Sequence, residues 1–395
     1  MRFLSGEVTV NIAGYEFSMQ STSNEIYVAS NAKAVIVLNS SFRVWENGYK
    51  FYKTGGGELV FRCPQGETKY LENITGYYKS RELFSVGEGT LTLDANGGRM
   101  DFQSTNVVVL AGAKLVFNGD CRMHTRTLLD LGINSRFEMT DSSDVWVSDV
   151  KGAGFIYANQ GTKSSRIIYY KNESDVPCFT GKFGGNLILD FDSGLKTRAA
   201  ASDFTVQSGD QLSEVAAVRS FNRFFRYAPG IGEFTVGAFD GYSAGATNYL
   251  QDTEGNPVTV RAGLQNAWSL SFAGPGDLWI TQASSQNLSG SRFSMTGWLG
   301  AAAGGVLTLG HNGDDFDLTK ATGTLKGIRA ESGGRVNFSH STFANIELPV
   351  RGSGNIYYVS PAGAKFTDLE LDGATELWLG GKSELAGGDE LRLLA

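Results

Sequence analysis

Apolar and polar residues alternate in short runs along most of this chain, and small residues separate the runs. The stretch from Gly87 to Asp120 shows this most clearly, because its apolar residues fall on alternate positions within each run: Leu91, Leu93, Met100, Phe102, Val107, Val109, Leu115 and Phe117. A period of two predicts β-strands that bury one face. The segments between the runs, 95–98 and 111–113, consist of Ala, Asn and Gly, which favours sharp bends.

A motif of the form Gly-x-Gly-x-apolar-x-apolar recurs along the chain. It occurs as GGGELVF, GEGTLTL, GAGFIYA, GIGEFTV, GPGDLWI and GSGNIYY, beginning at Gly55, Gly87, Gly152, Gly230, Gly274 and Gly352. The irregular intervals argue against a fixed-period array of helices and suit a coil of strands whose corners accept insertions. We therefore expect an all-β fold, a single parallel β-helix domain over residues 1–395, and a right-handed coil because parallel crossovers have that hand.

Two segments depart from this pattern. Residues 62–86 are more polar and less regular, which predicts an excursion from the coil. In residues 210–227, Leu212, Val215 and Ala216 recur at helical spacing, which predicts a short amphipathic helix inserted between strands.

Composition narrows the functional classes. The chain holds 51 Gly against 7 Pro, is 41% hydrophobic and only 19% charged, which is typical of a turn-rich folded protein rather than a disordered one. Its net charge of -7 argues against nucleic acid as a partner, because binding to phosphates needs clustered Lys and Arg. The three cysteines are widely spaced and form neither a disulfide framework nor a zinc pattern.

The ends of the sequence suggest where the protein works. The first residues lack the apolar run of a signal peptide, and no later segment is long enough to cross a bilayer, so we expect no membrane insertion here. We expect an extracellular or cell-surface protein whose signal sequence is absent from this chain. The strand pattern runs to both ends, so we expect either a fragment of a longer chain or open edges that a partner occupies, for example through end-to-end or trimeric self-association.

Four aromatic residues are candidate ligand-binding groups. Trp146, Trp279 and Trp378 each stand between two aliphatic residues, and Tyr357 stands between Ile356 and Tyr358. Because side chains alternate along a strand, aliphatic neighbours in the core direct these rings outward. Exposed flat rings stack on sugars and anchor protein interfaces, so the rings predict a contact strip. The alternative is that other parts of the chain cover them.

Carboxylates provide weaker candidates for chemistry. Asp190 and Asp192 lie two residues apart on one strand face, a spacing used by inverting glycosidases, but alternating leucines also make this an ordinary solvated face. Asp314, Asp315 and Asp317 form an acidic turn of the kind that binds calcium in stacked repeats, yet only one copy is present. We expect no catalytic site, no metal and no cofactor.

Three stretches carry a family resemblance: GEGTLTLDANGG, AGPGDLWITQASSQNLSG and GSGNIYYVSPAGAKFTDLELDG. They resemble the passenger repeats of bacterial autotransporters. That resemblance implies a right-handed parallel β-helix, surface display and adhesion to glycans or proteins of a host or bacterial surface. Two alternatives remain open: a phage tail spike or fibre module on a virion, which needs no signal sequence, and a polysaccharide lyase or hydrolase built on a β-helix.

Overall fold

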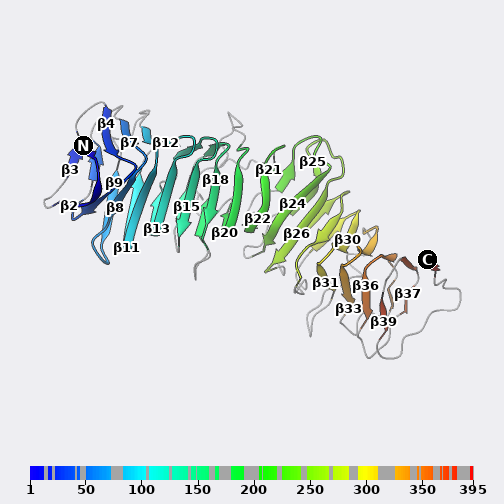
Figure 1. Ribbon diagram of the computed structural model, residues 1–395. Coiled ribbons are helices and arrows are strands. Elements are labelled where there is room, and N and C mark those ends of the chain that lie inside the picture. Colours follow the sequence, from blue (N-terminus) through cyan, green and yellow to red (C-terminus); the bar gives the residue numbers. More distant parts are fainter. Residues whose placement is uncertain are drawn as a thin grey trace. The chain divides into compact units, whose positions relative to one another are not determined.

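The computed structural model describes most of the chain as β-strands joined by turns (Figure 1). The described residues are 1–12, 17–19, 23–40, 42–44, 50–72, 83–103, 106–123, 127–140, 144–147, 149–159, 165–168, 179–190, 204–206, 208–219, 225–241, 247–266, 270–283, 292–309, 325–338, 345–346, 348–358, 365–366, 368–372, 376–379 and 392–394. These residues contain no helix, and hence none that could cross a membrane. The fold is a parallel β-solenoid, as the alternating pattern predicts.

The chain divides into two compact units. Unit 1 comprises residues 1–200 and 209–216, and unit 2 comprises residues 201–208 and 217–395. Strand β22 (Gln211–Arg219) contributes residues to both. The single domain over 1–395 stays a prediction.

In unit 1, successive turns of the coil build two main sheets. Sheet I consists of β1 (Arg2–Phe3), β4 (Ser23–Val28), β7 (Lys50–Thr54), β10 (Leu83–Val86), β12 (Asn106–Val109), β14 (Leu128–Leu131) and β17 (Asp149–Gly152). Sheet II consists of β2 (Gly6–Ile12), β5 (Ala32–Leu38), β8 (Glu58–Arg62), β11 (Thr90–Gln103), β13 (Lys114–Met123), β15 (Arg136–Thr140), β18 (Phe155–Ala158) and β20 (Lys182–Asp190).

Sheet II continues around a bend into a third row of strands. This row holds β3 (Phe17–Met19), β6 (Phe42–Val44), β9 (Thr68–Glu72), β16 (Asp144–Trp146) and β19 (Ser165–Ile168), together with the second halves of β11 and β13. The pairing of β11 with β13 shifts register between Asp94 and Arg99. The bend falls at Asn96 and Gly97, whose φ angles are 49° and 76°, so the small polar segment acts as the predicted corner.

Unit 2 repeats the plan with its own sheets. Sheet III consists of β21 (Phe204–Val206), β23 (Phe225–Tyr227), β25 (Thr247–Asp252), β27 (Ser271–Gly274) and β29 (Arg292–Met295). Sheet IV consists of β24 (Glu233–Asp240), β26 (Thr259–Gln265), β28 (Leu278–Ile280), β30 (Trp298–Ala301), β32 (Gly327–Ala330), β35 (Val350–Gly352), β38 (Leu369–Asp372) and β40 (Arg392–Leu394). Sheet V consists of β31 (Val306–Leu309), β33 (Arg335–Phe338), β36 (Asn355–Tyr358) and β39 (Leu377–Leu379), and β34 (Asn345–Ile346) pairs with β37 (Lys365–Phe366).

The alternating apolar residues form the core. All eight residues of the Gly87–Asp120 pattern are at most 1% exposed, and residues of one rung lie over their register partners in the next. Phenylalanines continue this packing from turn to turn: the rings of Phe51 and Phe84 stack with centroids 4.5 Å apart, and Phe117 and Phe137 meet edge to face at 5.0 Å. Such pairs add to the burial of apolar area that holds the coil together.

One corner of unit 1 holds a buried cation. The ammonium of Lys53 donates hydrogen bonds to the carbonyl oxygens of Gly57 at 2.7 Å and Glu88 at 2.6 Å, and also to that of Gly55. Burial lowers the pKa of Lys53 to about 8, and the charge of Glu88 opposes this change. All three bonds are internal, so this lysine closes the corner rather than presenting a charge to a ligand.

The predicted helix at 210–227 is wrong. Its described residues form β22 and β23, and in β22 the buried residues include Leu212, Val215 and Val218. Helical spacing in a short segment is weak evidence, because strand irregularities produce similar intervals. Here pairing with neighbouring turns of the coil decides the conformation.

The predicted excursion at 62–86 also needs correction where the structure describes it. Strand β9 pairs in parallel with β11, and β10 pairs with both β7 and β12. These residues therefore belong to the coil, and their polar side chains occupy its outer face. Residues 73–82 lie outside the described part of the chain.

Candidate functional site

Two of the four predicted aromatic residues come together on the outer face of sheet V. Asn337, Tyr357 and Trp378 are register partners on the neighbouring strands β33, β36 and β39 (Figure 1). The side chain of Ile356 is fully buried, so its neighbour Tyr357 faces outward, as strand alternation requires. The sequence thus folds these rings onto one surface, although 20 residues separate them.

The two rings are stacked. Their centroids lie 5.7 Å apart, and their planes differ by only 13°. On the preceding strand, the guanidinium carbon of Arg335 lies 4.1 Å from the centroid of Tyr357, within the range of a cation–π contact. Tyr357 is half-buried, whereas Trp378 is 59% exposed, so most of the open aromatic surface belongs to Trp378.

A single carboxylate oxygen holds both rings in place. Oε2 of Glu376 accepts hydrogen bonds from the hydroxyl of Tyr357 at 3.1 Å and from the indole Nε1 of Trp378 at 3.2 Å. The backbone N–H of Glu376 donates to Oδ1 of Asn355 at 3.3 Å, which ties the residue to β36. We call Arg335, Tyr357, Glu376 and Trp378 the aromatic platform.

The aromatic platform combines the groups that recognise a sugar. A flat exposed ring contacts the C–H face of a pyranose, and an adjacent carboxylate and guanidinium accept and donate hydrogen bonds to hydroxyl groups. Nε of Arg335 donates to Oδ1 of Asn337 at 2.6 Å, so the direction of its guanidinium is fixed. The arrangement is therefore held in place by contacts within the protein itself.

Trp279 does not join this surface. It is only 5% exposed, although Leu278 and Ile280 on either side point into the core. The guanidinium carbons of Arg261 and Arg329 lie 5.7 Å and 6.0 Å from its ring centroid. The ring faces outward as predicted, but neighbouring strands cover it, so Trp279 is a packing residue in this structure.

The remaining candidates are placed only in part. Trp146 is a register partner of Ile168 in the third row of unit 1, and its side chain lies outside the described part of the structure. Asp190 is 2% exposed at the end of β20, which is unlike a carboxylate that meets a polymer, and it has interactions within the protein.

Residues 191–200 and 310–324, which include Asp192, Asp314, Asp315 and Asp317, lie outside the described residues. Within those that are described, no group of three or more acidic, His or Cys side chains is arranged to hold a metal ion.

Among the residues that the structure describes, sequence reasoning missed Trp298. Trp298 begins β30 and faces outward on sheet IV, with Leu299 and Ala301 fully buried beneath it. Its preceding neighbour is Gly297, so it lacks the pair of flanking aliphatic residues that marks the other three. Strand parity gives the signal that was available: inward Leu299 and Ala301 force Trp298 outward.

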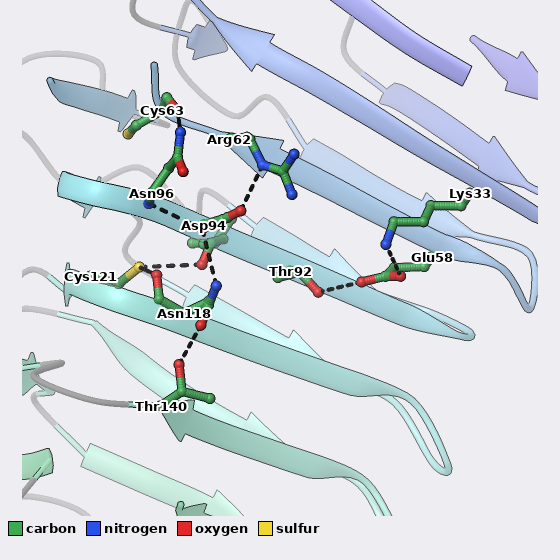
Figure 2. A network of polar contacts seen from close by, with 11 residues as sticks. Lys33, Glu58, Arg62, Cys63, Thr92, Asp94, Asn96, Asn118, Cys121 and Thr140 are labelled. Carbon is green, nitrogen blue, oxygen red and sulfur yellow. Dashed lines mark hydrogen bonds and ion pairs between the residues drawn. The ribbon is translucent and has the colours of Figure 1, made fainter. Parts of the chain in front are cut away.

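A polar cluster on the outer face of sheet II is a second candidate site (Figure 2). Asp94 accepts from Nε of Arg62 at 2.7 Å and from Nδ2 of Asn118 at 3.1 Å. The hydroxyl of Thr140 then donates to Oδ1 of Asn118 at 2.6 Å. These four residues are register partners on β8, β11, β13 and β15, so the bonds join successive turns. Because they use one another, we interpret this polar ladder as structural.

Two buried cysteines lie at the edge of the polar ladder (Figure 2). The thiol of Cys63 lies 3.4 Å from the carbonyl oxygen of Arg99, and that of Cys121 lies 3.3 Å from the carbonyl oxygen of Leu93. Burial raises the pKa of Cys63 to about 12 and raises the pKa of Cys121 as well. Both remain protonated at neutral pH, so neither is a nucleophile.

The described geometry therefore offers one preorganised aromatic surface that the sequence predicted in part. Comparison of the chain with protein-family models, with curated proteins and with solved structures found no match in any of the three.

Proposed function

We propose that this chain is a non-enzymatic, extracellular β-solenoid that binds surface glycans through the aromatic platform, in the manner of an autotransporter passenger. The observation that carries the proposal is the stacked pair of Tyr357 and Trp378 clasped by Glu376. A large exposed indole is costly in water unless it is used. The parallel coil supports the proposal because it presents side chains at a fixed spacing on a rigid surface.

Binding is tested on the purified protein with an array of neutral and acidic glycans from bacterial and host surfaces. The parent is expected to bind at least one glycan class, and the Tyr357→Ala/Trp378→Ala variant is expected to lose about tenfold or more in affinity, since stacking contributes roughly 1–2 kcal/mol per ring. Tyr70→Ala provides a matched control, because Tyr70 is an exposed aromatic of unit 1 at 40% exposure. Its affinity should equal that of the parent.

Two results would contradict the proposal. The first is a parent that binds no glycan, or a double variant that binds as well as the parent while remaining folded by circular dichroism. The second is release of reducing sugar or unsaturated ends from a bound glycan, which would identify an enzyme. Solution mass distinguishes the remaining rival: a detergent-resistant trimer would replace the passenger proposal by a phage tail-spike module.

A further inference from the structure

A second aromatic surface lies on the outer face of sheet IV. Trp298 on β30 is the register partner of Gly327 on β32, and Gly300 is the partner of Arg329. The side chain of Ile328, between Gly327 and Arg329, is fully buried, so these four residues share the outward face.

The indole of Trp298 rests on the main chain of the next turn. A Cβ atom on Gly327 would lie 2.4 Å from Cζ3 of Trp298, so the ring occupies the space that a side chain would need. The backbone N–H of Trp298 donates to Oδ1 of Asp277 at 2.8 Å, which fixes the start of β30. Trp298 is half-buried, so part of its side chain stays accessible to solvent.

One cation lies over this ring, and a second lies on the same outward face. Nζ of Lys326, the residue before β32, lies 5.5 Å from the ring centroid of Trp298, whereas Arg329 on β32 lies 6.0 Å from the ring centroid of Trp279. Both side chains are exposed, and neither forms a hydrogen bond or an ion pair with its side chain among the residues that the structure describes. We call Trp298, Lys326 and Arg329 the cationic patch.

The nearest carboxylates are engaged elsewhere. Glu331 accepts two hydrogen bonds from Arg261, both at 2.8 Å. Asp368 and Glu370 pair with Arg351 at 2.7 Å and 3.0 Å. Arg261 also pairs with Glu233 at 2.6 Å, so these two arginines serve four carboxylates, whereas neither Lys326 nor Arg329 forms an ion pair with a carboxylate that the structure describes.

We infer that the cationic patch binds an acidic saccharide, with a sugar ring stacked on Trp298 and its carboxylate or sulfate group paired with Lys326 and Arg329. Arg and Lys form their strongest hydrogen bonds with anionic oxygens, and the adjoining ring provides the apolar contact that a free inorganic anion lacks. This site differs from the aromatic platform in its residues, so either can fail alone.

Titration calorimetry of the full chain tests the inference with three defined probes. Octagalacturonate carries carboxylates, a heparin-derived octasaccharide carries sulfates, and maltooctaose is neutral. The parent is expected to bind at least one anionic probe, more weakly as salt is raised, and not to bind maltooctaose at the patch. Lys326→Ala/Arg329→Ala is expected to weaken binding of the anionic probe about tenfold or more.

The control variant removes the same charge elsewhere. Lys182 and Arg292 are both exposed, so Lys182→Ala/Arg292→Ala changes net charge equally and should leave the affinity within about twofold. The inference is overturned if the parent binds neither anionic probe, if the Lys326/Arg329 variant binds as tightly as the parent, or if the control variant loses as much. Whether carboxylate or sulfate binds identifies the acidic group.

Discussion

The indole of Trp279 lies over the backbone of Gly300, its register partner on the next strand of sheet IV. A Cβ atom added to Gly300 would lie 2.6 Å from Cζ3 of Trp279 and 2.4 Å from the carbonyl oxygen of Arg329. The same relationship joins Trp298 to Gly327. On this face, tryptophan and glycine therefore act as complementary partners in successive turns.

Gly300→Ala is expected to destabilise unit 2 by about 1–3 kcal/mol, because a backbone carbonyl cannot move away without disturbing the strand. Chemical denaturation followed by tryptophan fluorescence measures this. Gly232→Ala is the matched control, since a Cβ atom at Gly232 meets nothing within 4 Å. The control should be neutral or slightly stabilising. Equal stability of Gly300→Ala and the parent would show that the ring does not rest on the glycine.

The buried ion pair of unit 2 gives a second prediction. Nε of Arg219 lies 2.5 Å from Oδ2 of Asp240, and Oδ1 of Asp240 accepts from Asn266 at 2.8 Å. Arg219→Met alone should cost about 3–5 kcal/mol because it removes the cation that bonds to a buried carboxylate. Arg219→Met/Asp240→Leu should cost much less than the sum of the two single changes.

A double-mutant cycle by urea denaturation measures this coupling. The partly exposed pair of Arg122 and Asp120, with atoms 3.2 Å apart, provides the comparison. Its coupling should be below about 1 kcal/mol, as is usual for solvated pairs. A coupling energy of the buried pair no larger than that of the partly exposed pair would show that burial does not strengthen this interaction.

Acid should weaken unit 2 through Glu331. Hydrogen bonds from Arg261 lower the pKa of Glu331 below its ordinary value of 4.5, although burial acts in the opposite direction. The folded state thus binds fewer protons than the unfolded state near that pH, and stability is lost as pH falls from 4.5 through the lowered pKa. Glu331→Gln should therefore show a smaller fall in stability than the parent between pH 6 and pH 3 in denaturant titrations. Parallel curves for the two proteins would contradict this.

Tyr227 should tolerate loss of its hydroxyl. Its side chain is fully buried against Phe225 and Phe234, and its hydroxyl has no hydrogen-bond partner among the residues described. Tyr227→Phe should be neutral or stabilise the protein by about 1 kcal/mol, because it removes a buried polar atom that is not compensated. A loss of more than 1 kcal/mol in thermal denaturation would reveal a partner for this hydroxyl.

The strand pattern was predictable because its cause is local. Alternation in Gly87–Asp120 depends only on neighbouring residues, and the corner at Asn96 and Gly97 depends on residues that tolerate positive φ. The prediction of a helix at 210–227 was wrong because the conformation of this segment is not decided locally. It depends on pairing with other turns of the coil, whose residues lie far away in the sequence.

The candidate site was predictable to a similar degree. Parity placed Trp378 and Tyr357 outward, but it could not show that Glu376 bonds to both. Parity also placed Trp279 outward, yet its exposure is decided by Arg261 and Arg329, which approach from other strands. Whether side chains of other strands cover a ring depends on the register between turns. That register cannot be read from the sequence, because the loops between strands differ in length.

The polar ladder of Arg62, Asp94, Asn118 and Thr140 sets a rule for how this chain can change in evolution. Each of these side chains reaches its partner only when its strand keeps its register with the strands on either side. A one-residue insertion within β11 would move Asp94 to the core side and bring a leucine out to water. Insertions or deletions at the corners leave the register of the strands unchanged. The coil can therefore lengthen its loops freely while its strands accept substitutions but not single insertions.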